Sequence, residues 1–228
     1  GLMTPAEMRM LRPLNPSMGL MLESIAPRLR GRGGVHQWAP DKDPRRRLRM
    51  IDEAGALKIP FTTGILIGIG DTPAERAQSL IAIRDSHERH GHIQEVIIQN
   101  FRAKPGIPMA GAPEPDGFAM ARAIAAARLV LGPAMNVQAP PNLSPHEIEL
   151  FLRAGINDWG GISPLSKDYV NPEAPWPHLE RLAERCARAG FHLTQRLAIY
   201  PEFINAEWVD PALLPAVNQL MDRIGVEV

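Results

Sequence analysis

Cysteine is almost absent from this sequence, because Cys186 is the one thiol in 228 residues. A single thiol excludes an internal disulfide and any zinc site built from cysteines of this chain alone. Net charge is absent too, since 25 lysine and arginine residues are balanced by 25 aspartate and glutamate residues. The basic surface expected of a nucleic-acid-binding protein is therefore missing.

Long apolar runs are also lacking. No segment approaches the roughly 18 continuous apolar residues that cross a bilayer, and the first residues do not have the pattern of a secretory signal. We therefore expect no membrane association and a cytoplasmic location. The hydrophobic content of 45% is nevertheless enough to bury a sizeable core, so the sequence predicts a globular protein.

Familiar catalytic and phosphate-binding patterns are missing as well. The seven histidines are scattered, and the pair His87 and His90 is better explained as a solvated helix face than as a metal site. The glycines at 64–70 have neither the dinucleotide-binding spacing nor the lysine of a P-loop. No Ser-His-Asp order is visible either.

What the sequence does contain is a repeated alternation of apolar strands and amphipathic helices. Strands are predicted at residues 18–22, 61–68, 94–100, 136–139 and 157–163, with 192–199 as a further candidate. Helices are predicted at 4–11, 41–55, from a cap at Asp71 to near His90, 116–131, from a cap at Ser144, up to Ala189, and at 210–221. Such alternation indicates parallel strands joined by helices. A (β/α) barrel is favoured over a doubly wound sheet because the phosphate-binding turns are missing.

Polar residues gather where these strands end, which is where parallel barrels place their active sites. They are Glu23, Gln99, Asn100, Arg102, Gln138, Asn142, Asp158, Ser163 and Lys167, together with Thr62 and Thr63 within a strand. A carboxylate can hold ribose hydroxyls, a guanidinium can clamp a carboxylate, and amides can read a flat heterocycle. The sequence therefore predicts a polar binding site at this edge of the barrel.

Six motifs that follow one another in order resemble one enzyme family. They occupy residues 15–23, 40–44 with Arg47 and Leu48, 63–72, 99–105, 138–143 and 158–164. Together they resemble the radical S-adenosylmethionine subunit of 7,8-didemethyl-8-hydroxy-5-deazariboflavin synthase, over most of the chain. The resemblance implies a radical S-adenosylmethionine (β/α) barrel of the TIM type.

This resemblance implies a reaction in the synthesis of the deazaflavin chromophore of coenzyme F-420. In that family a 4Fe-4S cluster and S-adenosyl-L-methionine yield a 5'-deoxyadenosyl radical, which acts on an adduct of tyrosine and 5-amino-6-ribitylaminouracil. The adduct then cyclises with release of ammonia, so the enzyme is a carbon-nitrogen lyase. The implied partners are this small-molecule substrate and a sister radical subunit, or fused domain, that supplies the adduct.

The resemblance also implies which residues bind the cofactor. Glu23 would contact the ribose of S-adenosylmethionine, with a local loop hydrogen bond as the alternative. Arg47 would meet the carboxylate of the same cofactor, and a solvated helix arginine is an equal alternative. Thr63 and Gly64 would lie against the adenosyl group, although β propensity and close packing explain them as well.

Substrate contacts are expected from a second group of residues, namely Gln99, Asn100, Arg102, Gln138, Asn142 and Ser163. The first three are favoured because buried polar groups at a strand end need partners, and a uracil ring offers them. Loop capping is the alternative for the other three. Trp159 is expected either to stack on a ring or to belong to the core. No residue is assigned to the catalytic proton transfers.

One family feature is missing from the chain, the C-x3-C-x2-C loop that holds the cluster. Cys186 alone cannot supply the thiolates, so no metal ligand is assigned. The five strands match the fourth to eighth strands of the family barrel. We therefore expect residues 1–200 to form the C-terminal part of an incomplete barrel and residues 201–228 to form a helical extension.

This departure leaves more than one function open. We expect the chain by itself to be unable to generate the radical. It is then either a fragment of a fused two-activity synthase or a degenerate half-barrel that binds a small molecule without catalysis. A barrel lyase without a cluster is less favoured, because the strand ends carry neither metal-ligand clusters nor paired carboxylates.

Overall fold

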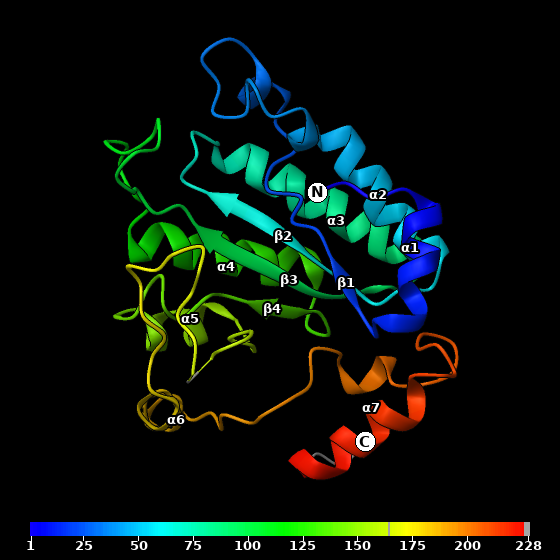
Figure 1. Ribbon diagram of the computed structural model, residues 1–228. Helices are drawn as coiled ribbons and strands as arrows, with labels where there is room; N and C mark the ends of the chain where they lie inside the picture. The colour runs from blue at the N-terminus through cyan, green and yellow to red at the C-terminus, as the bar shows by residue number, and fades with distance from the viewer. Residues whose placement is uncertain (164, 226–228) are drawn as a thin grey trace.

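The computed structural model of the protein describes residues 1–163 and 165–225. Within these residues, one sheet of four parallel strands has the order β1-β2-β3-β4 (Figure 1). The strands are β1 (Met18–Gly19), β2 (Phe61–Ile67), β3 (Ile93–Asn100) and β4 (Asn136–Gln138). Neighbours in the sheet are also neighbours in sequence, which is the progression of a (β/α) barrel and not that of a doubly wound sheet.

Helices connect and follow these strands. The α-helices are α1 (Pro5–Leu11), α2 (Pro44–Ala56), α3 (Pro73–His90), α4 (Gly117–Leu131), α5 (Ile148–Ala154), α6 (Leu179–Arg188) and α7 (Leu214–Ile224). Short 3-10 helices lie at Arg12–Leu14, Pro27–Arg30, Pro40–Lys42 and Pro201–Phe203. Local sequence explains several of the starts. Thr4 and Thr72 form capping boxes with the glutamates three residues further on, and Asp116 caps α4.

The hydrophobic core lies between the sheet and the helices that cover one of its faces. Figure 1 shows α3 and α4 running behind β2 and β3. Phe61 and Ile65 of β2 and Val96 of β3 are at most 1% exposed. They belong to one cluster with Leu80 of α3 and Ile124 of α4. Because side chains alternate along a strand, the residues between them point to the opposite face of the sheet.

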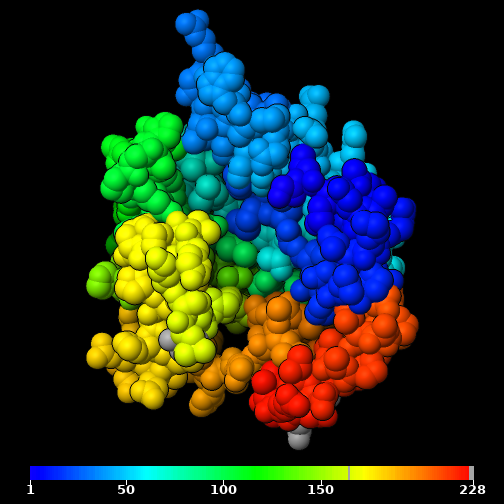
Figure 2. All heavy atoms as spheres, in the orientation of Figure 1, coloured from blue at the N-terminus to red at the C-terminus, as the bar shows by residue number. Residues whose placement is uncertain are grey.

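That opposite face, called the inner face below, carries polar residues in register. Thr62 pairs with Glu95, and Ile97 pairs with Gln138. In Figure 2 the strands lie at the back of a hollow bordered by the blue N-terminal residues, the yellow segment and the orange segment. The structure thus confirms an α/β fold with a parallel sheet, and this arrangement is compatible with part of a barrel.

The strand predicted at residues 157–163 is wrong. Asp158 makes one parallel bridge with Gln138, and the chain then turns away from the sheet. The backbone N–H of Gly160 donates to Asp158 Oδ1 at 2.5 Å, and the φ angle of Gly160 is 71°. Glycine adopts this left-handed conformation without a steric penalty, so it ends the extended segment. Within the described residues the sheet has four strands instead of the predicted five.

The further strand candidate at residues 192–199 is also wrong. This segment crosses below the inner face without joining the sheet. Arg196 donates hydrogen bonds to Asp158 and Glu95, which lie on that face. A short apolar alternation was compatible with a strand, but these side-chain contacts place the segment elsewhere.

Several predicted helix starts are displaced. The helix predicted at 41–55 begins at Pro44, and the one predicted at 210–221 begins at Leu214. Two further starts depend on competing caps. Asp71 accepts hydrogen bonds from the N–H groups of Gly68 and Ile69, which closes the glycine turn, and the cap of α3 is Thr72. The capping box predicted at Ser144 does not form, because α5 begins later and has no side-chain cap. In both places several polar residues compete for one cap, and the tertiary position of the turn decides between them.

The C-terminal segment has a small core of its own. Ile199, Tyr200, Phe203 and Val209 pack with Val217 of α7. Figure 1 shows this segment beneath the sheet, beside α1. The boundary predicted at residue 200 stays a prediction. None of the helices in the described part of the chain is long and apolar enough to cross a membrane.

Candidate functional site

A cavity of about 270 Å³ lies at the carboxyl ends of β3 and β4. It is lined by inner-face residues of these strands and by the loops that follow them: Ile97, Gln99, Gln138, Pro140, Asn142, Leu143, Trp159, Gly161, Asp168, Val170, Asn171 and Trp176. Apolar and aromatic walls with a few polar groups are typical of small-molecule sites, and this edge is where barrels bind ligands. We therefore take this cavity as the candidate site.

Asn142 has a side-chain carbonyl oxygen to which no described residue donates a hydrogen bond. Its side chain is buried, and Nδ2 donates to Asp168 Oδ2 at 3.0 Å and to the carbonyl oxygen of Ala174 at 3.2 Å. Among the described residues Oδ1 has no hydrogen-bond partner. A buried acceptor without a partner costs free energy unless a ligand or water serves it.

Asp168 holds the loop that covers the cavity. Its Oδ1 accepts hydrogen bonds from the N–H groups of Val170 at 2.8 Å and Asn171 at 3.1 Å, and its Oδ2 accepts one from Asn171 Nδ2 at 3.0 Å. Burial acts to raise the pKa of Asp168, but hydrogen bonds from Asn171, Val170 and Asn142 outweigh it and hold the pKa below its usual value. Asp168 is therefore an ionised acceptor that organises this wall.

Of the three residues favoured as substrate contacts, Gln99 lines the cavity, whereas Asn100 and Arg102 stand behind its wall. Asn100 Nδ2 and Arg102 Nη1 each donate to the carbonyl oxygen of Leu143 at 3.3 Å. Arg102 also pairs with Glu114 at 3.0 Å. Both side chains thus hold the Leu143 segment in place, and their contact with a substrate stays a prediction.

The other predicted substrate contacts divide in the same way. Gln138 lines the cavity and packs over Gly160, where a Cβ atom would overlap its amide. Trp159 lines the cavity as well and is also part of the core. Ser163 Oγ accepts a hydrogen bond from the N–H of Ser166 at 2.9 Å, so it organises its own loop. Substrate binding by Gln138 and Ser163 stays a prediction.

Glu23 lies beyond the end of β1 among three basic side chains. Its Oε2 is 3.3 Å from His36 Nε2, its Oε1 is 3.2 Å from Arg47 Nη1, and Lys42 donates to it as well. Burial acts to raise the pKa of Glu23, but hydrogen bonds from His36 and Lys42 and the charges of Lys42 and Arg47 hold it below its usual value. Both carboxylate oxygens are therefore engaged inside the chain, and a ribose contact stays a prediction.

Arg47 is buried, with 4% of its surface exposed, so the alternative of a solvated helix arginine is wrong. Its guanidinium donates to the carbonyl oxygen of Asp41 at 2.8 Å, to Asp41 Oδ2 at 3.4 Å, to Met21 and to Glu23. These bonds tie the start of α2 to the end of β1. A bidentate clamp on a cofactor carboxylate would require some of them to break.

Thr63 and Gly64 have clear packing roles. Thr63 is fully buried, and its hydroxyl accepts a hydrogen bond from the N–H of Leu22 at 3.3 Å. A Cβ atom at Gly64 would overlap the carbonyl oxygen of Ile97, so the glycine permits the close approach of β2 and β3. Contact of either residue with an adenosyl group stays a prediction.

A second polar layer lies deeper on the inner face, near the starts of the strands. Arg196 Nη2 is 2.9 Å from Glu95 Oε2, and Arg196 Nε is 2.5 Å from Asp158 Oδ2. The hydroxyl groups of Tyr200 and Thr62 donate to Asp158 at 2.7 Å and to Glu95 at 2.8 Å. Burial raises the pKa of Glu95 above its usual value in spite of the charge on Arg196. Each of these groups is satisfied by the others.

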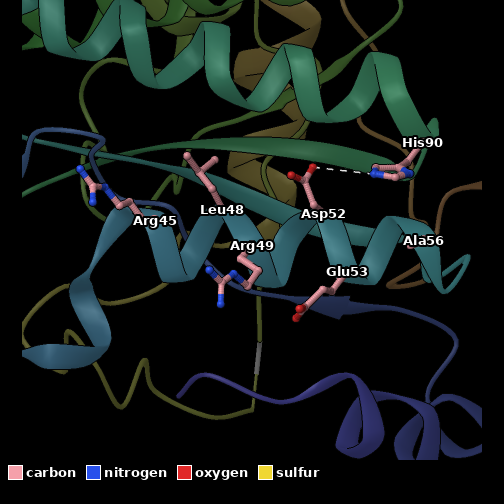
Figure 3. Close-up of a pocket in the computed structure, with 7 residues that line it drawn as sticks. All are labelled: Arg45, Leu48, Arg49, Asp52, Glu53, Ala56 and His90. Atoms are coloured by element: carbon pink, nitrogen blue, oxygen red, sulfur yellow. Dashed lines mark ion pairs between the residues drawn. The ribbon is translucent and has the colours of Figure 1, made fainter.

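A larger hollow of about 550 Å³ lies on α2, on the helix side of the sheet (Figure 3). It is lined by Arg45, Leu48, Arg49, Asp52, Glu53, Ala56 and His90. Asp52 accepts hydrogen bonds from Ser86 at 2.6 Å and Arg89 at 2.7 Å and lies 3.8 Å from His90 Nε2. Asp52 thus ties α2 to α3, and the residues that line the hollow belong to these two helices and not to the strand ends. Its size alone does not make it the site.

Comparison with known proteins identifies the family. The chain is 52% identical over 225 residues to the 7,8-didemethyl-8-hydroxy-5-deazariboflavin synthase of Methanopyrus kandleri, which covers 99% of the chain and 67% of that protein. The chain belongs to this deazariboflavin synthase family. The synthase of the same name from Methanothermobacter thermautotrophicus is 51% identical over 217 residues, 95% of the chain and 66% of that protein. No protein-family model matches the chain.

The deazariboflavin synthase family also includes longer relatives. The chain is 51% identical over 226 residues to the FO synthase of Mycobacterium tuberculosis, which is 97% of the chain but 26% of that protein. The chain therefore spans about two thirds of the length of the first relatives and about a quarter of the second kind. The family resemblance drawn from the six motifs is confirmed.

The residues of this chain do not fit the 4Fe-4S cluster that the resemblance implies. Cys186 is 2% exposed, lies within α6 and packs in the main core. Residues 1–163 and 165–225 contain no group of three or more His, Cys, Asp or Glu side chains placed to hold a metal ion. No ligand of the cluster can therefore be assigned to a residue described here.

Several residues that line the cavity and two that surround Glu23 were not predicted from the sequence. Asp168 and Asn171 carried a usable signal, because an aspartate that accepts from N–H groups two and three residues further on forms an Asx turn. Lys42, beside Glu23, lay inside a motif that was noticed for its family resemblance alone. His36 and Trp176 lie in long loops without periodicity, so nothing local pointed to them.

Proposed function

We propose that this chain is the substrate-holding part of a 7,8-didemethyl-8-hydroxy-5-deazariboflavin synthase. The observation that carries the proposal is its identity of about one half, over 95% or more of its length, to proteins of that name. Because the chain spans only about two thirds of those proteins, the activity of the whole enzyme is inferred from them. The sheet would then be part of a radical S-adenosylmethionine barrel of the TIM type.

The cavity has chemistry that suits the expected substrate, an adduct of tyrosine and 5-amino-6-ribitylaminouracil. The uracil ring is flat and offers both N–H donors and carbonyl acceptors. Gln99, Gln138 and Asn142 present amide groups at the cavity, and Trp159 and Trp176 present flat apolar surfaces. This combination supports binding and orientation of the uracil part of the adduct.

The radical step depends on groups that the described residues do not hold. The family resemblance implies that a 4Fe-4S cluster and S-adenosylmethionine supply the radical, yet the one cysteine of the chain is buried in α6. Glu23 and Arg47 also have their polar atoms engaged inside the chain. We therefore expect the chain alone to produce neither 5'-deoxyadenosine nor deazaflavin.

A chimeric enzyme tests the proposal. The matching part of the Methanopyrus kandleri synthase is replaced by this chain, the cluster is reconstituted without oxygen, and the adduct is supplied by the sister activity. We expect deazaflavin and 5'-deoxyadenosine from the chimera and neither from the chain alone. A chimera that forms 5'-deoxyadenosine but no deazaflavin, while the parent enzyme forms both, would contradict the proposed substrate role.

A second candidate is binding of a small molecule without catalysis. It is favoured by the single buried cysteine and by the saturated contacts of Glu23 and Arg47. Under this alternative the chain binds the uracil part of the adduct, and the chimera shows no turnover. The same chimera assay therefore separates the two candidates.

A further inference from the structure

Two residues that line one cavity each hold a buried polar atom, and the two atoms, of opposite kind, have no hydrogen-bond partner among the described residues. They are Oδ1 of Asn142, an acceptor, and Nε1–H of Trp176, a donor. A buried polar atom costs free energy when nothing bonds to it, so two of them on residues that line one cavity point to a group that bonds to both.

The orientation of the Asn142 amide follows from its surroundings. Its two neighbours at hydrogen-bond distance, Asp168 Oδ2 and the carbonyl oxygen of Ala174, can only accept. The NH₂ group must therefore face them, and the oxygen is the free end. Asp168 is itself held by two N–H groups of its loop, so it sets the direction of the amide without offering itself to the cavity.

The charge of the lining narrows the class of ligand. Among the lining residues there is no lysine, arginine or histidine, and the one acid, Asp168, is satisfied by Asn142, Val170 and Asn171. A phosphate or carboxylate would find no cation here, and a cation would find no free carboxylate. The lining suits a neutral, planar group that carries its own donor and acceptor.

We propose that Asn142 and Trp176 select the imide edge of a pyrimidinedione ring. Asn142 Oδ1 accepts the ring N–H, Trp176 Nε1 donates to the neighbouring ring carbonyl, and Asp168 positions the amide. This inference rests on the proposed function and deepens it, because it names the edge of the substrate that is read and the residues that read it. Gln99 and Gln138 are then free to serve the remaining polar atoms of the ring.

Two ring compounds test the selection on the unaltered full chain. Isothermal titration compares 6-aminouracil with 3-methyl-6-aminouracil, in which a methyl group replaces the hydrogen of the imide. We expect 6-aminouracil to bind at least about tenfold more tightly, since one hydrogen bond is lost and one buried acceptor stays unserved. Equal affinity for the two compounds, or no binding of 6-aminouracil, would overturn the proposal without any substitution being needed.

A matched pair of tryptophan variants tests the donor. Trp176→Phe removes the N–H and keeps an aromatic ring, and Trp38→Phe does the same at a side chain that is 87% exposed. We expect Trp176→Phe to weaken 6-aminouracil binding about tenfold and Trp38→Phe to leave it unchanged. In the unaltered chain, the indole N–H resonance that Trp176→Phe removes should shift when 6-aminouracil is added. Unchanged affinity in Trp176→Phe would contradict the role of the indole.

The positioning role of Asp168 has a separate readout. In Asp168→Asn the amide of Asn142 is no longer fixed, so we expect the preference for 6-aminouracil over its 3-methyl derivative to fall towards one. Asp222→Asn, at an exposed position of α7, is the control and should keep the preference. A preference that survives in Asp168→Asn would show that the aspartate only holds the loop.

These results are distinguishable from failure of the proposed function. Selective binding of 6-aminouracil to the chain, with no deazaflavin from the chimera, would leave the pocket inference standing and remove the synthase role. Deazaflavin production that is unaffected by Trp176→Phe in the chimera would leave the synthase role standing and remove the pocket inference.

Discussion

The inner face of the sheet carries two polar layers that differ in whether their atoms have partners. Near the strand starts, the carboxylates of Glu95 and Asp158 both bond to the guanidinium of Arg196. At the strand ends, Asn142 and Trp176 each keep a buried polar atom that no described residue serves. The bridge between residues 138 and 158 brings the two layers into direct contact.

This difference indicates that one layer stabilises the fold and that the other is available to bind a ligand. A saturated network has nothing left to offer a ligand, and it rigidifies the elements that it joins. An unsaturated pair costs stability in the free protein and gains it back when the right group binds. We therefore expect the layer near the strand starts to contribute to stability and the unsatisfied pair at the strand ends to contribute to binding. The following substitutions test whether the two layers behave differently.

The largest expected effect comes from breaking the saturated layer. Arg196→Met leaves the carboxylates of Glu95 and Asp158 buried without their cation, and we expect a loss of about 3–5 kcal/mol in the free energy of unfolding. Urea denaturation measures it. Arg188→Met, at a side chain that is 64% exposed, is the control and should cost less than about 1 kcal/mol. Equal losses in the two variants would show that the saturated layer does not support the fold.

A buried histidine outside both layers, His92, provides a further test through the pH dependence of stability. His92 is fully buried, lines neither cavity, and its ring nitrogens have no hydrogen-bond partner in the described chain. Burial, and then the charge of His90, lower its pKa from 6.5 to about 4, and the charge of His87 adds to this. The backbone of Ile51 and the charge of Asp52 act in the opposite direction and do not offset burial. An orphan polar group of this kind should cost stability and bind nothing.

The sign of the pH dependence follows from this shift. The unfolded chain takes up a proton at His92 near pH 6.5, whereas the folded chain does so only near pH 4. The free energy of unfolding should therefore fall as the pH drops from about 6.5 to about 4, by about 3 kcal/mol at 1.36 kcal/mol per pKa unit. Urea denaturation across this range measures it. His92→Leu should remove this part of the dependence and the exposed control His146→Leu should not; an unaltered profile in His92→Leu would contradict the assignment.

The smallest expected effect lies in the unsaturated layer. Trp176→Phe removes a donor that bonds to no residue in the described part of the chain, so we expect the free energy of unfolding to change by less than about 1 kcal/mol. Thermal denaturation without and with 6-aminouracil measures it, and the stabilisation by the ligand should shrink. A decrease of more than about 2 kcal/mol in the free energy of unfolding without ligand would show that Trp176 stabilises the fold, and the two layers would then not differ.

Local pattern was sufficient wherever neighbours in sequence decide the structure. The strands at β2 and β3 and the helices α3 and α4 lie close to the predicted residues, because continuous apolar runs and capping residues act within a few positions. The segments 157–163 and 192–199 were predicted wrongly because strand pairing depends on a partner elsewhere in the chain. In the second segment Arg196 is drawn to two carboxylates more than thirty positions away.

For the candidate site too, the residues at strand ends were predicted and the residues contributed by a distant loop were not. Gln99, Gln138 and Asn142 were expected at strand ends, and the structure brings all three to one cavity. The loop that carries Asp168 and Trp176 closes over them from elsewhere in the chain, which no local pattern indicated. The roles of these residues in binding stay predictions until ligands are tested.

The sequence by itself determined the family, the alternation of strands and helices, and the absence of thiolates for a cluster, since each is a property of residue order or composition. Only the tertiary structure decided which polar atoms are satisfied. Arg47 and Glu23 proved to be engaged with each other, whereas Asn142 and Trp176 keep unused atoms. Hydrogen-bond satisfaction depends on distances between residues far apart in the chain, and folding alone sets those distances.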